Sequence, residues 1–89
     1  MRHAARTDAT QAEVVKALRA IGASVYYCKL PLDLLVCHRG VTMLVEVKEP
    51  NGRLTKVQEH FLETWPGRVH IVRGPLEAVA AVVGAEAMK

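Results

Sequence analysis

The sequence predicts a small α/β domain with its elements in the order α-β-β-β-α-β-α. Two segments repeat apolar residues at helical spacing, and short runs of β-branched or aromatic residues lie between and after them. Two of these runs are apolar almost throughout, which is typical of strands that are covered on both faces. We therefore expect a mixed sheet with a layer of helices on each side.

The first helix is expected to begin at Asp8, because Asp8 and Gln11 match the pattern of a capping box. Gly22 stands where the C-terminus of a helix favours glycine. Between these two points, apolar residues recur every three or four positions, as on the buried face of a helix. These residues are Val14, Val15, Leu18 and Ile21.

Three strands are expected next, over residues 24–30, 33–38 and 41–48. All three are rich in β-branched, aromatic or other apolar residues. The second and third meet at Arg39-Gly40, which predicts a hairpin with a short loop of either two or four residues.

Thr55 and Gln58 form a second capping box, which opens a helix that Pro66-Gly67 ends. Residues 69–72 form a fourth strand, and Gly74-Pro75 begin a last helix. A strand that is reached through a helix runs parallel to the strand it joins, so we expect a parallel pairing here. The apolar stripe of the second helix consists of Leu54, Val57, Phe61, Leu62 and Trp65.

Composition limits the classes of protein that the sequence can represent. Its 89 residues are expected to form one domain, with 51% hydrophobic and 24% charged residues. The net charge of +3 comes from Lys and Arg spread along the chain, so no basic tail indicates a partner. No apolar run suits a membrane span or a signal peptide. Two cysteines fit neither a disulfide framework nor a four-cysteine zinc site, so we expect reduced thiols in the cytoplasm.

Two carboxylates are expected to face each other near the open end of the hairpin. The pairing that places His38 opposite Val41 also places Asp33 opposite Glu46. Residues directly opposite each other lie on one face of a sheet, with Cβ atoms roughly 5 Å apart. Lys48 follows Glu46 by two positions and therefore shares that face.

Like charges that oppose each other within an apolar sheet repel unless a cation lies between them. A hard divalent ion such as Mg²⁺ takes carboxylate oxygens of this kind as ligands. With the Lys48 ammonium, the pair suits phosphodiester hydrolysis, in which a metal polarises the phosphate and activates water. The alternative is ordinary alternation on an edge strand, with Glu46 and Lys48 solvated and Asp33 a turn residue after Pro31.

Four short motifs follow one another along the chain. They are Thr10-Gln11-Ala12-Glu13, Asp33-Leu34-Leu35-Val36, Glu46-Val47-Lys48 and Gly52-Arg53-Leu54-Thr55-Lys56-Val57-Gln58. Their order and spacing resemble the PD-(D/E)XK nuclease superfamily, and more narrowly the stand-alone VRR-Nuc domains of phage and bacterial origin. The resemblance covers residues 8–73 of the single domain 1–89. One departure is Leu32, which separates Pro31 from Asp33, whereas the family more often has the proline next to the aspartate.

This resemblance implies a restriction-endonuclease-like αβββαβ core, with one extra helix at the C-terminal end. It implies that Asp33 and Glu46 bind Mg²⁺ or Mn²⁺, with the carbonyl of Val47 as a third oxygen ligand. It also implies that Lys48 is the catalytic lysine.

Two further site residues follow from the resemblance, each with a structural alternative. Gln58 would reach toward water or phosphate, but it is equally the capping-box partner of Thr55. Glu13 would approach the site from the first helix, yet it lies beside the apolar stripe and also suits a solvated helix flank. Arg53 and Lys56 flank the site and are the candidate contacts to DNA phosphates.

We therefore expect a divalent-metal-dependent DNA endonuclease, with a non-catalytic nucleic-acid-binding module on the same fold as the alternative. Stand-alone domains of the family favour branched DNA, and a homodimer would supply the two cuts that a four-way junction needs. A flap or single-strand nuclease is the alternative substrate class. On the last helix, Val79, Val82 and Val83 either cover the second face of the sheet or form part of a subunit interface. The expected location is the cytoplasm of a bacterial cell or a phage-infected host.

Overall fold

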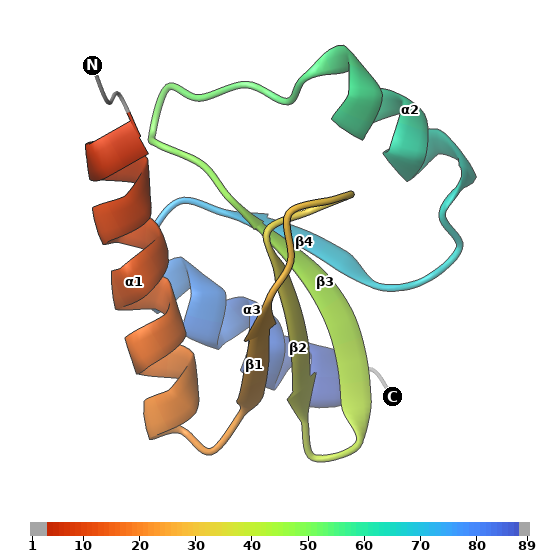
Figure 1. Cartoon of the computed structure of the whole chain (residues 1–89). Helices are drawn as coiled ribbons and strands as arrows, with labels where there is room; N and C mark the ends of the chain where they lie inside the picture. Colours follow the sequence, from red (N-terminus) through yellow and green to blue (C-terminus); the bar gives the residue numbers. More distant parts are fainter. Residues whose placement is uncertain (1–3, 88–89) are drawn as a thin grey trace.

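The computed structural model of the protein describes residues 4–87, which form a four-stranded sheet and three helices (Figure 1). The strand order is β1-β2-β3-β4, with antiparallel pairs up to β3 and a parallel pairing of β3 with β4, as predicted. Within these residues, no helix has both the length and the apolar character needed to cross a membrane. The elements are α1 (Ala4–Ala20), β1 (Ser24–Tyr27), β2 (Leu34–His38), β3 (Val41–Val47), α2 (Lys56–Thr64), β4 (Val69–Val72) and α3 (Pro75–Ala87).

Helix α1 begins at Ala4, so the predicted start at Asp8 is wrong. The helical backbone runs through Asp8 because the alanines before it are strong helix formers. The predicted end is confirmed. Gly22 has a φ of +94°, and the N–H of Ala23 donates to the carbonyl of Leu18 over 3.0 Å, as in a Schellman motif.

The hairpin between β2 and β3 fixes the register of the sheet. Arg39 and Gly40 have φ values of +51° and +82°, the pair of positive angles that a type I′ turn requires. The loop therefore has two residues, and the predicted pairing of His38 with Val41 is confirmed. In this register, the pairing of β2 with its neighbours begins at Leu34, the residue that directly follows Asp33.

The first strand ends at Tyr27 and is shorter than predicted, and the second begins at Leu34, one residue later than predicted. Residues 28–33 form an irregular connection between them. The N–H of Cys28 donates to the carbonyl of Asp33 over 2.6 Å, which closes this connection. Leu32, the residue that separates Pro31 from Asp33, is fully buried. The inserted leucine therefore anchors the segment that delivers Asp33 to the start of β2.

The hydrophobic core lies on one face of the sheet, where α1 and α3 pack side by side (Figure 1). On α3, Val82 is fully buried in this core, whereas Val83 remains exposed. The last helix therefore covers the sheet on the same face as α1, so the predicted placement on the second face is wrong. The buried members of the core are Val14, Val15, Leu18, Ala23, Val25, Leu34, Val36, Val41, Met43, Val45, Val47, Val72, Ala78, Val82 and Ala85.

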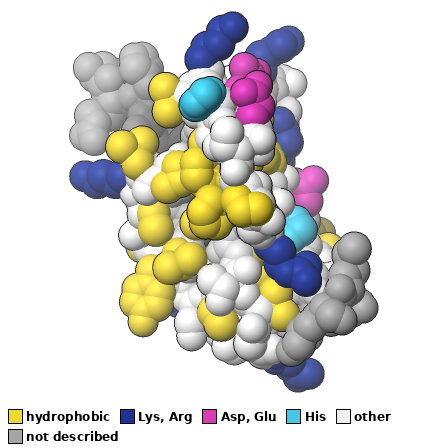
Figure 2. Space-filling view, turned by 90° about the vertical axis from the view of Figure 1, so that its right-hand side faces the viewer, with side chains coloured by type: hydrophobic (Ala, Val, Ile, Leu, Met, Phe, Trp, Pro, Cys, Tyr) yellow, Lys and Arg dark blue, Asp and Glu magenta, His cyan; other side chains and the backbone are white. Residues whose placement is uncertain are grey.

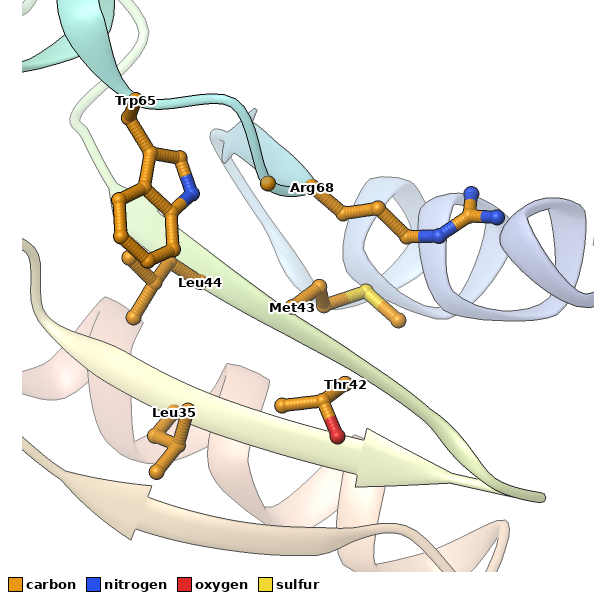
Figure 3. A pocket seen from close by; sticks show the side chains of 7 residues that line it. Leu35, Thr42, Met43, Leu44, Trp65 and Arg68 are labelled. Carbon is orange, nitrogen blue, oxygen red and sulfur yellow. The ribbon is translucent and has the colours of Figure 1, made fainter.

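The opposite face of the sheet is covered less than predicted. Helix α2 has nine residues and buries none of them, and Trp65 at its end is 42% exposed. Figure 2 shows hydrophobic side chains at the surface on the side of the molecule where α2 lies. Trp65, Leu35 and Leu44 line an open apolar pocket on this side (Figure 3). The predicted second layer is thin because this helix is too short to cover the sheet.

Candidate active site

The carboxylates of Asp33 and Glu46 lie together where β2 and β3 separate. The backbone N–H of Val47 donates to Asp33 Oδ2 over 2.9 Å, and the backbone N–H of Asp33 donates to Glu46 Oε1 over 3.1 Å. Each carboxylate thus accepts a hydrogen bond from the backbone of the other segment. The two side chains continue the pairing of the hairpin beyond its last paired residues, and the structure brings together the residues that the register placed opposite each other.

Glu46 is only 3% exposed, and two more polar side chains accompany it. Lys48 Nζ lies 3.1 Å from Glu46 Oε2, and Gln58 Nε2 donates to the same oxygen over 2.8 Å. A carboxylate is buried at low cost only when it is paired and hydrogen-bonded. Lys48, Gln58 and the N–H of Asp33 together meet that condition.

Gln58 is the capping-box partner of Thr55, as predicted, and it also contacts Glu46. The side-chain Oε1 of Gln58 accepts from the backbone N–H of Thr55 over 3.1 Å, and the backbone N–H of Gln58 donates to Thr55 Oγ1 over 3.1 Å. The predicted capping box is therefore confirmed. The Nε2 of Gln58 is free to reach Glu46 because a carboxamide has an acceptor end and a donor end. The start of α2 is thereby fixed at the carboxylate pair.

From α1, the side chain of Gln11 approaches Asp33 and lowers the pKa of its carboxyl. Glu13, the predicted residue from this helix, is exposed instead. The signal for Gln11 was present in the sequence. Gln11 precedes Val14 and Val15 at helical spacing and so lies on the buried stripe, whereas Glu13 lies beside it.

Arg73, which follows β4, supports the loop beyond β3, a role that the sequence did not reveal. Its Nε donates to the carbonyl of Pro50 over 3.3 Å and its Nη2 to the carbonyl of Gly52 over 3.0 Å. No local pattern marks this contact, because it joins residues that are far apart in the sequence. Arg53 and Lys56 are exposed on the segment that follows, between this loop and the first turn of α2.

Burial raises the pKa of Asp33 above its ordinary value, and the neighbouring charge of Glu46 adds to the rise. The hydrogen bond from the Val47 N–H is the strongest opposing effect on this pKa, and Gln11 and Lys48 also lower it. The cluster therefore holds two carboxylates against one ammonium in a partly buried place. A bound cation or a proton would relieve the remaining repulsion.

The oxygen donors of the cluster fit a small, hard cation. Within the described residues, no group of three or more His, Cys, Asp and Glu side chains is arranged to hold a metal ion. Mg²⁺ does not need such a group, since it is commonly bound through one or two carboxylates and keeps several waters. Asp33 and Glu46 could supply those carboxylates, and Val47, which follows Glu46 directly, could add a backbone oxygen.

Comparison with known proteins supports this fold. A solved structure described as a VRR_NUC domain superposes on the chain with a TM-score of 0.71 and 23% sequence identity. The match covers 85% of this chain and 92% of that chain. No protein-family model matches the sequence, and the search of curated proteins gives no significant match. The chain therefore has the fold of a VRR_NUC domain, which confirms the predicted restriction-endonuclease-like architecture.

The raised pKa of Asp33 predicts that Asp33→Asn stabilises the metal-free protein at neutral pH. The folded state holds the Asp33 proton more tightly than the unfolded chain, so stability is lost as pH rises through the pKa of the folded state. Asparagine carries no charge and can still accept from the Val47 N–H. Chemical unfolding across pH should show a gain for the variant at pH 7 that shrinks as pH falls through the carboxyl range.

As a matched control, Glu13→Gln removes an exposed carboxylate from the same molecule and should change stability little at any pH. A loss of stability in Asp33→Asn at pH 7 would contradict the electrostatic description of the cluster.

Proposed function

We propose that the protein is a divalent-metal-dependent endonuclease that hydrolyses phosphodiester bonds in DNA. The observation that carries this proposal is the convergence of Asp33, Glu46 and Lys48, with Gln58 reaching in from α2. Two carboxylates and an ammonium at one end of a sheet have the chemistry needed to hold a metal beside a phosphate and to offset charge. The VRR_NUC domain that shares this fold is consistent with a nuclease.

In the proposed reaction, Asp33, Glu46 and the carbonyl of Val47 would hold Mg²⁺ or Mn²⁺. When bound, such a metal supplies Lewis acidity toward the phosphate and lowers the pKa of a bound water. Lys48 stays beside Glu46, with its side chain largely buried, so its charge is held where negative charge develops in the transition state. Gln58 fixes the orientation of the Glu46 carboxylate through its amide.

A non-catalytic DNA-binding module is the rival function on this fold, and the buried carboxylates argue against it. A surface that only binds DNA benefits from positive charge, since phosphate contacts dominate the affinity. Asp33 and Glu46 would instead repel a phosphate that approached without a cation. Burying Glu46 also requires three polar partners, an arrangement that phosphate binding does not need.

Arg53 and Lys56 are proposed as contacts to DNA phosphates beside the site. Both side chains are exposed, one in the loop after β3 and the other in the first residue of α2. Arg73 hydrogen-bonds to the loop that precedes Arg53, so the fold fixes the backbone from which Arg53 extends. Contacts of this kind orient DNA without reading its sequence.

The two lysines Lys48 and Lys56 provide a matched test of chemistry against binding. Lys48→Ala should lower single-turnover cleavage by roughly 10²- to 10³-fold with little change in DNA affinity, since its charge acts in the transition state. Lys56→Ala should instead weaken binding and reduce its salt dependence by about one phosphate contact. Cleavage rates in Mg²⁺ and binding at several salt concentrations would be measured for both.

Glu46→Gln, which removes a proposed metal ligand, should abolish cleavage in the same assay. Wild-type activity that persists after chelation of divalent metal would contradict the proposed reaction. Equal effects of Lys48→Ala and Lys56→Ala on affinity would contradict the separate roles of the two lysines.

For the substrate, we propose a homodimer that cleaves four-way or otherwise branched DNA in preference to linear duplex. One chain offers one carboxylate pair, whereas symmetrical cleavage of a junction needs two, which a twofold dimer provides. Leu35 and Trp65 leave an apolar region exposed on the sheet face away from the core, which suits contact with a second copy. This region replaces the predicted interface of Val79, Val82 and Val83, because Val82 is buried in the core and Val79 packs against it.

Leu35→Lys tests the dimer and the substrate together, because a charge in an apolar interface opposes association. The variant should be monomeric by light scattering, and it should nick junctions without resolving them. Leu76→Lys, which alters an exposed leucine on α3, should remain dimeric and active. Wild-type protein that has the mass of one chain, 9.8 kDa, and cuts linear duplex as readily as junctions would contradict this proposal.

A further inference from the structure

A second hollow lies between the connection of β1 to β2 and helix α2. Its volume is about 490 Å³, which is within the range of small-molecule sites. Most of its lining is apolar, and it opens broadly to solvent. The lining residues are Leu30, Pro31, Val57, His60, Phe61 and Thr64.

The two walls of the hollow expose apolar side chains that nothing in the described chain covers. Leu30 on the connecting segment is 79% exposed, and Val57 on α2 is 67% exposed. Phe61 is stacked on Trp65, with ring centroids 5.2 Å apart, so an aromatic ring is held in place beside them. These side chains form an open apolar surface against which a planar ring could pack.

Each wall also joins directly to the proposed active site. Pro31 is followed after one residue by Asp33, and Val57 is followed immediately by Gln58, whose amide holds Glu46. The hollow and the carboxylate pair are therefore built from the same two segments. A strand with its phosphate at the carboxylate pair would carry its neighbouring nucleotide past the hollow.

Each wall of the hollow is next in the sequence to a lysine, whose charge suits a DNA strand. Lys29 precedes Leu30 on one wall and Lys56 precedes Val57 on the other, and both lysines are exposed. An open apolar site with an exposed lysine next to each wall matches an unpaired nucleotide, which offers a ring to the site and phosphates to the lysines.

We infer that this hollow receives an unstacked nucleobase of the substrate, next to the phosphate that is cleaved. The inference rests on the proposed nuclease function and narrows its substrate class. A base within a continuous duplex is stacked on both sides and cannot enter the hollow without leaving the helix. The favoured substrates are therefore strands with an unpaired nucleotide at the cut, as in a flap, a loop or a junction whose branch point has opened.

A second protein chain is the other occupant to consider, but the hollow is too small to hold one alone. A stable protein interface uses roughly 20–30 residues on each side, whereas six residues line this hollow. The exposed apolar region at Leu35 and Trp65 is the proposed interface, and the hollow is lined by a different set of residues.

The test compares two DNA duplexes that differ only in a short unpaired loop in one strand. In one duplex the loop consists of thymidines, and in the other it consists of abasic sites with the same backbone. Binding is measured by fluorescence anisotropy without divalent metal, so that cleavage does not interfere. The protein should bind the thymidine loop at least about fivefold more tightly, the lower end of what one stacked base contributes.

Two serine variants provide the matched comparison. The double variant Leu30→Ser, Val57→Ser should bind both loops equally, because its hollow no longer offers apolar walls. Leu76→Ser changes an exposed leucine on α3 and should keep the full preference. Leu30, Val57 and Leu76 are all largely exposed, so none of these changes empties the core.

Equal binding of the two loops by the wild-type protein would overturn this inference. If that protein still cleaves DNA in Mg²⁺, the proposed function stands and only the base site is lost. If it neither binds nor cleaves DNA, both fail. A double variant that keeps the preference, or that loses a dimer instead of the preference, would also overturn the base site.

Discussion

The structure depends on how two like charges, Asp33 and Glu46, are kept together at the end of a hairpin. Where β2 and β3 separate, the backbone of each segment donates to the carboxylate of the other. The carboxylates thus extend the pairing of the two strands through side-chain hydrogen bonds. The same hydrogen bonds stabilise the two negative charges, of which that of Glu46 is buried and that of Asp33 is partly buried. The repulsion that remains between them is what makes a cation at this place favourable.

Side chains from both helices that approach this end of the sheet reach the same pair. Gln11 contacts Asp33 from α1, and Gln58 contacts Glu46 from α2, each through a neutral amide. For α2 this contact matters most, because the helix buries none of its residues and has little packing to hold it. Structure and proposed chemistry are therefore linked, since any change at Glu46 also affects the helix that forms one wall of the hollow.

Much of this arrangement follows from local sequence patterns. The short turn at Arg39-Gly40 defines the register, and that register brings Asp33 to Glu46. Three features could not be predicted from local sequence patterns. They are the thin covering by α2, the placement of α3 and the approach of Gln11, in place of Glu13, to the carboxylate pair. Each depends on how helices cross the sheet, which apolar periodicity does not specify. Of these, only the role of Gln11 has a signal in the sequence, because Gln11 is a polar residue on the buried stripe of its helix.

Direct measurement of metal binding in the absence of DNA tests the central claim most simply. Titration of the protein with Mn²⁺, followed by calorimetry or by the electron paramagnetic resonance of the free ion, should show binding to the wild-type chain. Asp33→Asn and Glu46→Gln should each lose it, while Glu13→Gln, which alters an exposed carboxylate, should bind as the wild type does. A wild-type protein that binds no Mn²⁺, or variants at Asp33 and Glu46 that bind it unchanged, would contradict the account.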